Sequence, residues 1–135
     1  MDIYHHRPHA SARRFESGTP NACGVFAAEA GLQVLMDVGM QAVGEQIDRI
    51  TTLVKDAVDA HDWELVTPRD RHGAMLAIRS SDAPTLVERL AERDIILTER
   101  DGNIRVATHF YNNGADVEKL VAALEAESAL LVSRS

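Results

Sequence analysis

One arginine stands in the middle of a stretch near the end of the chain that has the pattern of a β-strand. In GNIRVATHFYNN, residues 102–113, Ile104 and Val106 flank Arg105 and point to the opposite face of a pleated strand. A guanidinium is planar, stays charged and binds a carboxylate through two hydrogen bonds. The pattern leaves two interpretations open: the face that carries Arg105 meets water, or its guanidinium has a partner.

The elements that must position Arg105 follow from the spacing of the apolar residues. Asn21 and Asp82 are suited to cap helices, and Gly39 is suited to end one. The first helix is mostly apolar, and we expect it to be mostly buried. The expected elements, in chain order, are helices at 22–38 and 40–60, strands at 63–67 and 74–80, a helix at 83–94, strands at 95–99 and 103–108, and a helix at 113–131.

This order, ααββαββα, predicts an α+β fold. Because most of the strands are joined by short turns, we expect an antiparallel sheet with helices packed mainly on one face. Residues 1–20 lack apolar periodicity and are predicted to form an extended lead-in to a single domain at 21–135.

The composition excludes several classes of function. Twenty-one acidic residues against 14 basic ones give a formal charge of −7, which disfavours nucleic acid because binding to it depends on clustered Lys and Arg. No apolar run approaches the roughly 20 residues that cross a bilayer, so we expect no membrane partner and a cytoplasmic location. The single cysteine, Cys23, excludes an internal disulfide and is expected to be a small buried apolar residue.

The histidines do not predict a metal site. His5, His6 and His9 lie in a tail that contains proline and has no carboxylate or thiolate placed to complete a ligand set. His72 and His109 likewise have no acidic residue at a telling spacing. We therefore expect no metal ligand in this chain.

Two segments, RRFESGTPN at 13–21 and IRVATHFYNNGADVEKLVAAL at 104–124, resemble the C-terminal part of the class V aminotransferase family of pyridoxal-phosphate enzymes. This family includes kynureninases, isopenicillin N epimerase-like proteins and cysteine desulfurases. The resemblance implies that the chain corresponds to the small domain of such an enzyme. It also implies that a large domain, which carries the lysine that binds the cofactor covalently and most of the phosphate ligands, is missing here.

The resemblance assigns roles to three residues. Arg105 matches the arginine that holds the α-carboxylate of the amino-acid substrate. Gly18 and Thr19 match the pair that, in dimeric members, contacts the phosphate of the cofactor bound to the other subunit. Two copies of the chain are therefore expected to associate.

No catalytic residue is expected in this chain. Its two lysines, Lys55 and Lys119, fall on helices and are interpreted as surface residues, so pyridoxal phosphate is expected in the intact enzyme and not bound to this chain alone. Phe110, Tyr111 and Asn112 follow the family pattern but are expected to shape the turn between strand and helix.

The resemblance does not fix the reaction. In cysteine desulfurases of this family, an extra loop with a catalytic cysteine precedes the strand that carries the arginine. Here the path from residue 97 to residue 103 is too short for that loop, which argues against desulfurase chemistry. The alternative that stays open is a free-standing α+β ligand-binding or regulatory module without pyridoxal-phosphate chemistry.

Overall fold

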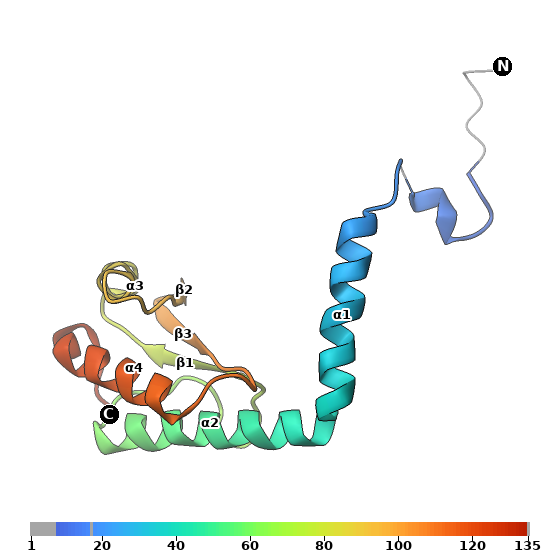
Figure 1. The fold of residues 1–135 in the computed structure, drawn as a ribbon. Coiled ribbons are helices and arrows are strands. Elements are labelled where there is room, and N and C mark those ends of the chain that lie inside the picture. Colours follow the sequence, from blue (N-terminus) through green and yellow to red (C-terminus); the bar gives the residue numbers. More distant parts are fainter. Residues whose placement is uncertain (1–7, 17, 135) are drawn as a thin grey trace. The chain divides into compact units, whose positions relative to one another are not determined.

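The computed structural model of the protein describes residues 8–16 and 18–134 (Figure 1). The chain divides into two compact units, with the boundary between Val38 and Gly39. His5 and His6 lie outside the described residues.

The first unit contains a short 3-10 helix, η1 (Ala12–Phe15), and the helix α1 (Ala22–Val38). The Oδ1 atom of Asn21 accepts a hydrogen bond from the Gly24 amide at 3.0 Å, so the predicted N-cap is confirmed. A Cβ atom at position 24 would lie 2.5 Å from Nδ2 of Asn21, so a larger residue there would force the capping side chain to shift. Gly39 has a positive φ of 86°, and the helix ends before it as predicted.

The burial expected for α1 is wrong for this structure. None of its residues is buried, and large apolar side chains such as Phe26, Leu32 and Met36 are more than half exposed. The helix is apolar around most of its circumference, a pattern typical of helices that are covered on all sides. The pattern predicts that another protein surface packs on the apolar side chains of α1, but it does not show which part of the protein provides that surface.

The second unit contains a three-stranded antiparallel sheet with strand order β1-β3-β2, together with helices α2, α3 and α4 (Figure 1). The predicted fold class is confirmed. The elements are α2 (Met40–Ala60), β1 (Met75–Arg79), α3 (Ala83–Ala91), β2 (Thr98–Arg100), β3 (Asn103–Ala107), α4 (Gly114–Ala126) and a 3-10 helix, η2 (Ser128–Leu130).

The core lies on one face of the sheet. In the register, Leu76 pairs with Val106 and Ile78 pairs with Ile104, so these four side chains point to the same side. They form a single apolar cluster with buried residues of α2, α3 and α4, and α2 packs along α4 (Figure 1). The helices therefore cover one face of the sheet and leave the other face free of helices.

The predicted order is wrong at one element. Residues 63–67 form only isolated bridges, with Leu65 opposite Ile78 and Trp63 opposite Ser133. The amide of Glu64 donates to the carbonyl of Val132, while the carbonyl of Glu64 accepts from the amide of Arg79. The backbone hydrogen bonds of residues 63–67 go partly to β1 and partly to the C-terminal segment. The residues therefore form no continuous strand ladder with either of them.

The turn between β2 and β3 fixes the register of the strand that carries Arg105. Asp101 and Gly102 both have positive φ, at 52° and 74°, and they form the two-residue loop of the hairpin. Asp-Gly is a preferred sequence for such loops because both positions must adopt left-handed backbone conformations. The loop places Thr98 opposite Arg105.

Among the described residues, no single helix is long and apolar enough to cross a membrane, although α1 and α2 taken as a pair meet the same criteria of length and composition.

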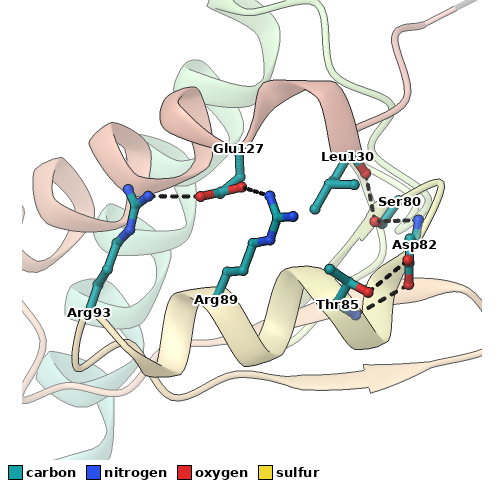
Figure 2. Close-up of polar contacts among 7 residues, drawn as sticks. All are labelled: Ser80, Asp82, Thr85, Arg89, Arg93, Glu127 and Leu130. Carbon is teal, nitrogen blue, oxygen red and sulfur yellow. Dashed lines mark hydrogen bonds and ion pairs between the residues drawn. The ribbon is translucent and has the colours of Figure 1, made fainter.

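A buried carboxylate ties the end of the chain to α3. Glu127 is 9% exposed, and its two carboxylate oxygens accept hydrogen bonds from Arg89 of α3 and from Arg93, which follows that helix, each at 2.7 Å (Figure 2). The hydrogen bond to Glu127 raises the pKa of Arg89 above its ordinary value. The hydroxyl of Ser80, the residue after β1, donates to the carbonyl of Leu130 at 2.6 Å and so contacts the same C-terminal segment.

We expect Glu127→Ala to lower the free energy of unfolding by about 1–3 kcal/mol, because the two arginines lose a charged partner that water replaces only in part. Both arginines are about half exposed, which places the effect in the lower part of that range. Urea denaturation measures it. The control is Glu118→Ala on the exposed side of α4, and equal midpoints for the two variants would contradict a stabilising role for Glu127.

Candidate functional site

Arg105 lies on the sheet face that no helix of the second unit covers. It sits in the central strand, with Ala77 of β1 and Thr98 of β2 as its partners on either side. Ala107, also small, follows on the same face. The side chain of Arg105 is half-buried.

The guanidinium of Arg105 keeps its charge available. Among the described residues, no carboxylate oxygen lies within 4.0 Å of it. The two acidic residues nearest in sequence are placed elsewhere: Glu99 stands opposite Ile104 and so on the other face, and Asp101 lies 3.7 Å from Arg100. By contrast, Arg79 on β1 is paired with Glu64 at 2.7 Å. No carboxylate of the described residues therefore neutralises the guanidinium of Arg105.

One side chain contacts the guanidinium directly. The Nε–H of Arg105 donates to the Sδ atom of Met75, at 2.9 Å. Met75 lies opposite Ala107 and is therefore a diagonal neighbour of Arg105 on the open face. The sequence alone carries no signal for this residue, because only the strand register brings Met75 to Arg105.

The segment after β3 is a tightly bonded corner. The amide of His109 donates to the side chain of Asn112, and Gln46 of α2 donates to the carbonyl of Asn112 at 2.8 Å. Asn113 and Asp116 form a capping box at the start of α4. His109 stacks on Tyr111 with ring centroids 4.5 Å apart. These contacts agree with the prediction that Tyr111 and Asn112 shape the turn between strand and helix.

A cavity of about 240 Å³ opens at the end of β3, on the helix side of the sheet. Its lining includes Ala107, Thr108, Asp116 and Lys119, but not Arg105. Arg105 therefore does not line this cavity, although Ala107, which follows it on the open face, borders it.

Gly18 and Thr19 belong to the first unit, and both are exposed. They precede α1, and a Cβ atom added to Gly18 would meet no other atom within 4 Å. Their backbone and hydroxyl groups are open to a ligand, although no side chain of this chain completes a site around them in the described residues.

Neither lysine of this chain is placed for covalent attachment of a cofactor. Lys55 is half-buried on α2, where its Nζ atom donates to Nε2 of His72 at 2.9 Å, so it is less solvated than predicted. Lys119 is exposed on α4, and its Nζ atom lies 3.4 Å from the carbonyl oxygen of Asp94. Both lie on helices away from the open sheet face, so these lysines do not fit the covalent role in pyridoxal-phosphate chemistry.

Cys23 is exposed on α1, so the prediction that it is buried is wrong. The expected burial of Cys23 followed from the expectation that α1 itself is mostly buried. In the described part of the chain, no group of three or more His, Cys, Asp or Glu side chains is arranged to hold a metal ion. The ring Nδ1 of His9 lies 2.9 Å from the hydroxyl of Ser11 and accepts a hydrogen bond from the Ser11 amide at 3.3 Å.

Residues 43–124, from α2 to α4, match the family model of the kynureninase C-terminal domain. The chain belongs to this family. Members of the class V group of pyridoxal-phosphate enzymes are similar to it over most of its length. The chain is 31% identical over 121 residues to the uncharacterized aminotransferase YcbU of Bacillus subtilis, and 31% identical over 127 residues to a kynureninase of Deinococcus radiodurans.

This kynureninase-type domain is shorter than the proteins it matches. The two alignments cover 87% and 88% of this chain, but only 32% and 31% of the relatives. The chain therefore spans about a third of the length of these relatives. The large domain predicted to be missing is consistent with that coverage.

Solved structures support the fold of the domain. A cysteine desulfurase from Thermococcus onnurineus NA1 superposes with a TM-score of 0.81 at 18% identity, over 93% of this chain and 36% of that protein. A cysteine desulfurase from Escherichia coli gives a TM-score of 0.68 at 27% identity, over 87% of this chain and 33% of that protein. The first likeness concerns the fold alone. In the domain described here, the two-residue loop between β2 and β3 leaves no room for an inserted loop before the arginine strand.

Proposed function

We propose that this chain acts as the C-terminal domain of a class V pyridoxal-phosphate enzyme and that Arg105 binds the carboxylate of its amino-acid substrate. The observation that carries the proposal is the free guanidinium of Arg105 on the open face of the sheet. A site for a substrate carboxylate must keep its positive charge unneutralised until the substrate arrives.

The residues around Arg105 suit a small carboxylate. Its two cross-strand partners, Ala77 and Thr98, have small side chains, so neither of them blocks the approach of a carboxylate to the guanidinium. Two parallel hydrogen bonds from the guanidinium would fix both the position and the orientation of the amino acid. When bound, pyridoxal phosphate supplies the electron sink for the reaction, and the task of Arg105 is to orient the substrate.

Gly18 and Thr19 are proposed to contact the phosphate of a cofactor held by a second copy of the protein. Their exposure, and the space around Gly18, support a ligand that approaches from outside the first unit. The Gly18 and Thr19 amides and the Thr19 hydroxyl are suitable donors to a phosphate. In this proposal, residues 1–20 connect the small domain at 21–135 to the large domain.

The covalent step requires a lysine that this chain lacks in a suitable position. We therefore propose that the chain alone is not catalytic and that the large domain supplies the catalytic lysine. The exposed apolar surface of α1 supports a covering surface that comes from outside the first unit. We propose that the large domain covers α1, and that without it α1 contributes to association between copies.

The carboxylate role can be tested on this chain by NMR, with acetate as the probe. The sheet provides internal controls, because Arg79 is paired with Glu64 and Arg100 lies next to Asp101. We expect the side-chain N–H signals of Arg105 to shift with acetate at lower concentrations than those of Arg79. Sodium chloride at equal ionic strength serves as the control for screening.

The response of Arg105 to acetate distinguishes the carboxylate-binding domain of a pyridoxal-phosphate enzyme from a free-standing module. A preferential response of Arg105 supports a carboxylate site on the open face. If Arg105 responds no more than Arg79, the carboxylate role is wrong. The free-standing module without this chemistry is then the better interpretation.

A further inference from the structure

The contact between Met75 and Arg105 is built by the register of the sheet. Met75 pairs with Ala107 and Arg105 pairs with Ala77, so the two long side chains start from diagonal positions on one face. Diagonal positions in an antiparallel pair are about 7–8 Å apart, which long side chains can bridge. Here the gap is closed by the Nε–H of Arg105 and the Sδ atom of Met75, at 2.9 Å.

A thioether differs from a carboxylate as a partner for arginine. Sulfur in methionine is a weak acceptor without charge, so it can hold the Nε–H while the guanidinium keeps its full positive charge. Arg79 shows the other case on the same strand as Met75, since its Nε–H donates to the carboxylate of Glu64 at 2.7 Å. Met75 can therefore orient the guanidinium of Arg105 without neutralising its charge, whereas a carboxylate such as that of Glu64 would neutralise it.

The contact also restricts how a ligand can approach. A carboxylate can bind a guanidinium from the side, through Nε and one Nη, or from the end, through both Nη atoms. In this structure the Nε–H already donates to Met75. The two Nη atoms are the edge that remains for a bidentate ligand.

We propose that Met75 is a positioning residue, which holds Arg105 so that a substrate carboxylate binds end-on through the two Nη atoms. The inference rests on the proposed carboxylate role of Arg105 and adds the geometry of approach and the residue that sets it. Met75 is 42% exposed, so its side chain lies at the rim of the open face and can contact both Arg105 and solvent.

The test compares the full chain with its Met75→Leu variant, because leucine keeps the apolar volume and removes the sulfur acceptor. The first measurement is the rate at which the Arg105 Nε–H exchanges with water, followed by NMR. We expect exchange to be roughly two- to fivefold faster in the variant, as for the loss of one weak hydrogen bond. Met40→Leu makes the same chemical change at the first residue of α2 and should leave this rate unchanged.

The second measurement is acetate affinity at Arg105, which we expect to fall roughly two- to fivefold in Met75→Leu. In the unaltered chain, acetate should shift the Nη–H signals of Arg105 while the Nε–H keeps its slow exchange. Unchanged backbone amide shifts in α2 and α4 would show that the variant is folded. A variant that merely repacked the surface would not change Nε–H exchange and acetate affinity together.

The possible failures are distinguishable. If acetate binds Arg105 in the unaltered chain and Met75→Leu changes neither the exchange rate nor the affinity, the positioning role is wrong and the carboxylate role stands. If bound acetate releases the Nε–H from its slow exchange, the ligand approaches from the side and the end-on geometry is wrong. If Arg105 responds to acetate no more than Arg79 does, the carboxylate role fails and the positioning role fails with it.

Discussion

Arg105→Lys is expected to weaken amino-acid binding about 10- to 100-fold in an enzyme assembled from this chain and its large domain. An ammonium offers a single point of charge and cannot donate two parallel hydrogen bonds to a carboxylate. Loss of one hydrogen bond to a charged group costs on the order of 1.5–3 kcal/mol, which corresponds to that range. Substrate titration at saturating pyridoxal phosphate measures the dissociation constant.

Cofactor binding should stay unchanged in the same variant, because Arg105 is assigned to the substrate and not to the phosphate. The matched control is Arg100→Lys, which makes the same change on the neighbouring strand at an exposed arginine close to Asp101. The control should bind the amino acid as tightly as the unaltered enzyme. Equal substrate affinity in both variants would leave Arg105 as a residue of the sheet surface only.

Ile104→Ala is expected to lower the free energy of unfolding by about 2–5 kcal/mol. Ile104 is fully buried in the central strand, where it pairs with Ile78 and joins the cluster under the three helices. Truncation removes buried apolar contact and leaves a cavity that the surrounding strands and helices cannot fully close. Urea denaturation followed by circular dichroism measures the effect, and the midpoint should fall accordingly.

The matched control removes the same atoms at an exposed isoleucine. Ile96 is 79% exposed beside the sheet, so Ile96→Ala should change the free energy of unfolding by less than about 0.5 kcal/mol. If Ile104→Ala leaves too little folded protein to measure, Ile104→Val should still cost about 0.5–1.5 kcal/mol. Comparable losses for Ile96→Ala and Ile104→Ala would show that the core is not organised around β3.

The sequence contained enough information for most local structure in the second unit. The apolar stripe of α2 predicted a helix over residues 40–60, and the structure has the helix over the same residues. Asp82 caps α3 through a hydrogen bond from the Thr85 amide, as its residue type predicted. The Asp-Gly pair at 101–102 has the residue types that a two-residue hairpin loop requires, and both residues have positive φ in the structure. Each of these features depends on neighbours within a few residues, so the signal is local.

The two clearest errors concern contacts between distant segments. The strand expected at 63–67 exists only as isolated bridges, because residues near the C-terminus take part of its backbone bonds. The burial expected for α1 and Cys23 failed because apolar periodicity shows which surface needs a cover and not what supplies the cover. Nothing within the helix itself carries that information.

The same distinction between local sequence information and tertiary contacts applies to Arg105. Strand alternation in the sequence by itself determined that Arg105 points away from Ile104 and Val106, since the side-chain period of a strand is fixed by its backbone. Whether a carboxylate lies close to the guanidinium of Arg105 was decided only by the tertiary structure. Pairing across the sheet places Glu99 on the opposite face and brings Met75 from 30 residues away, and a register that differs by one residue would exchange these neighbours.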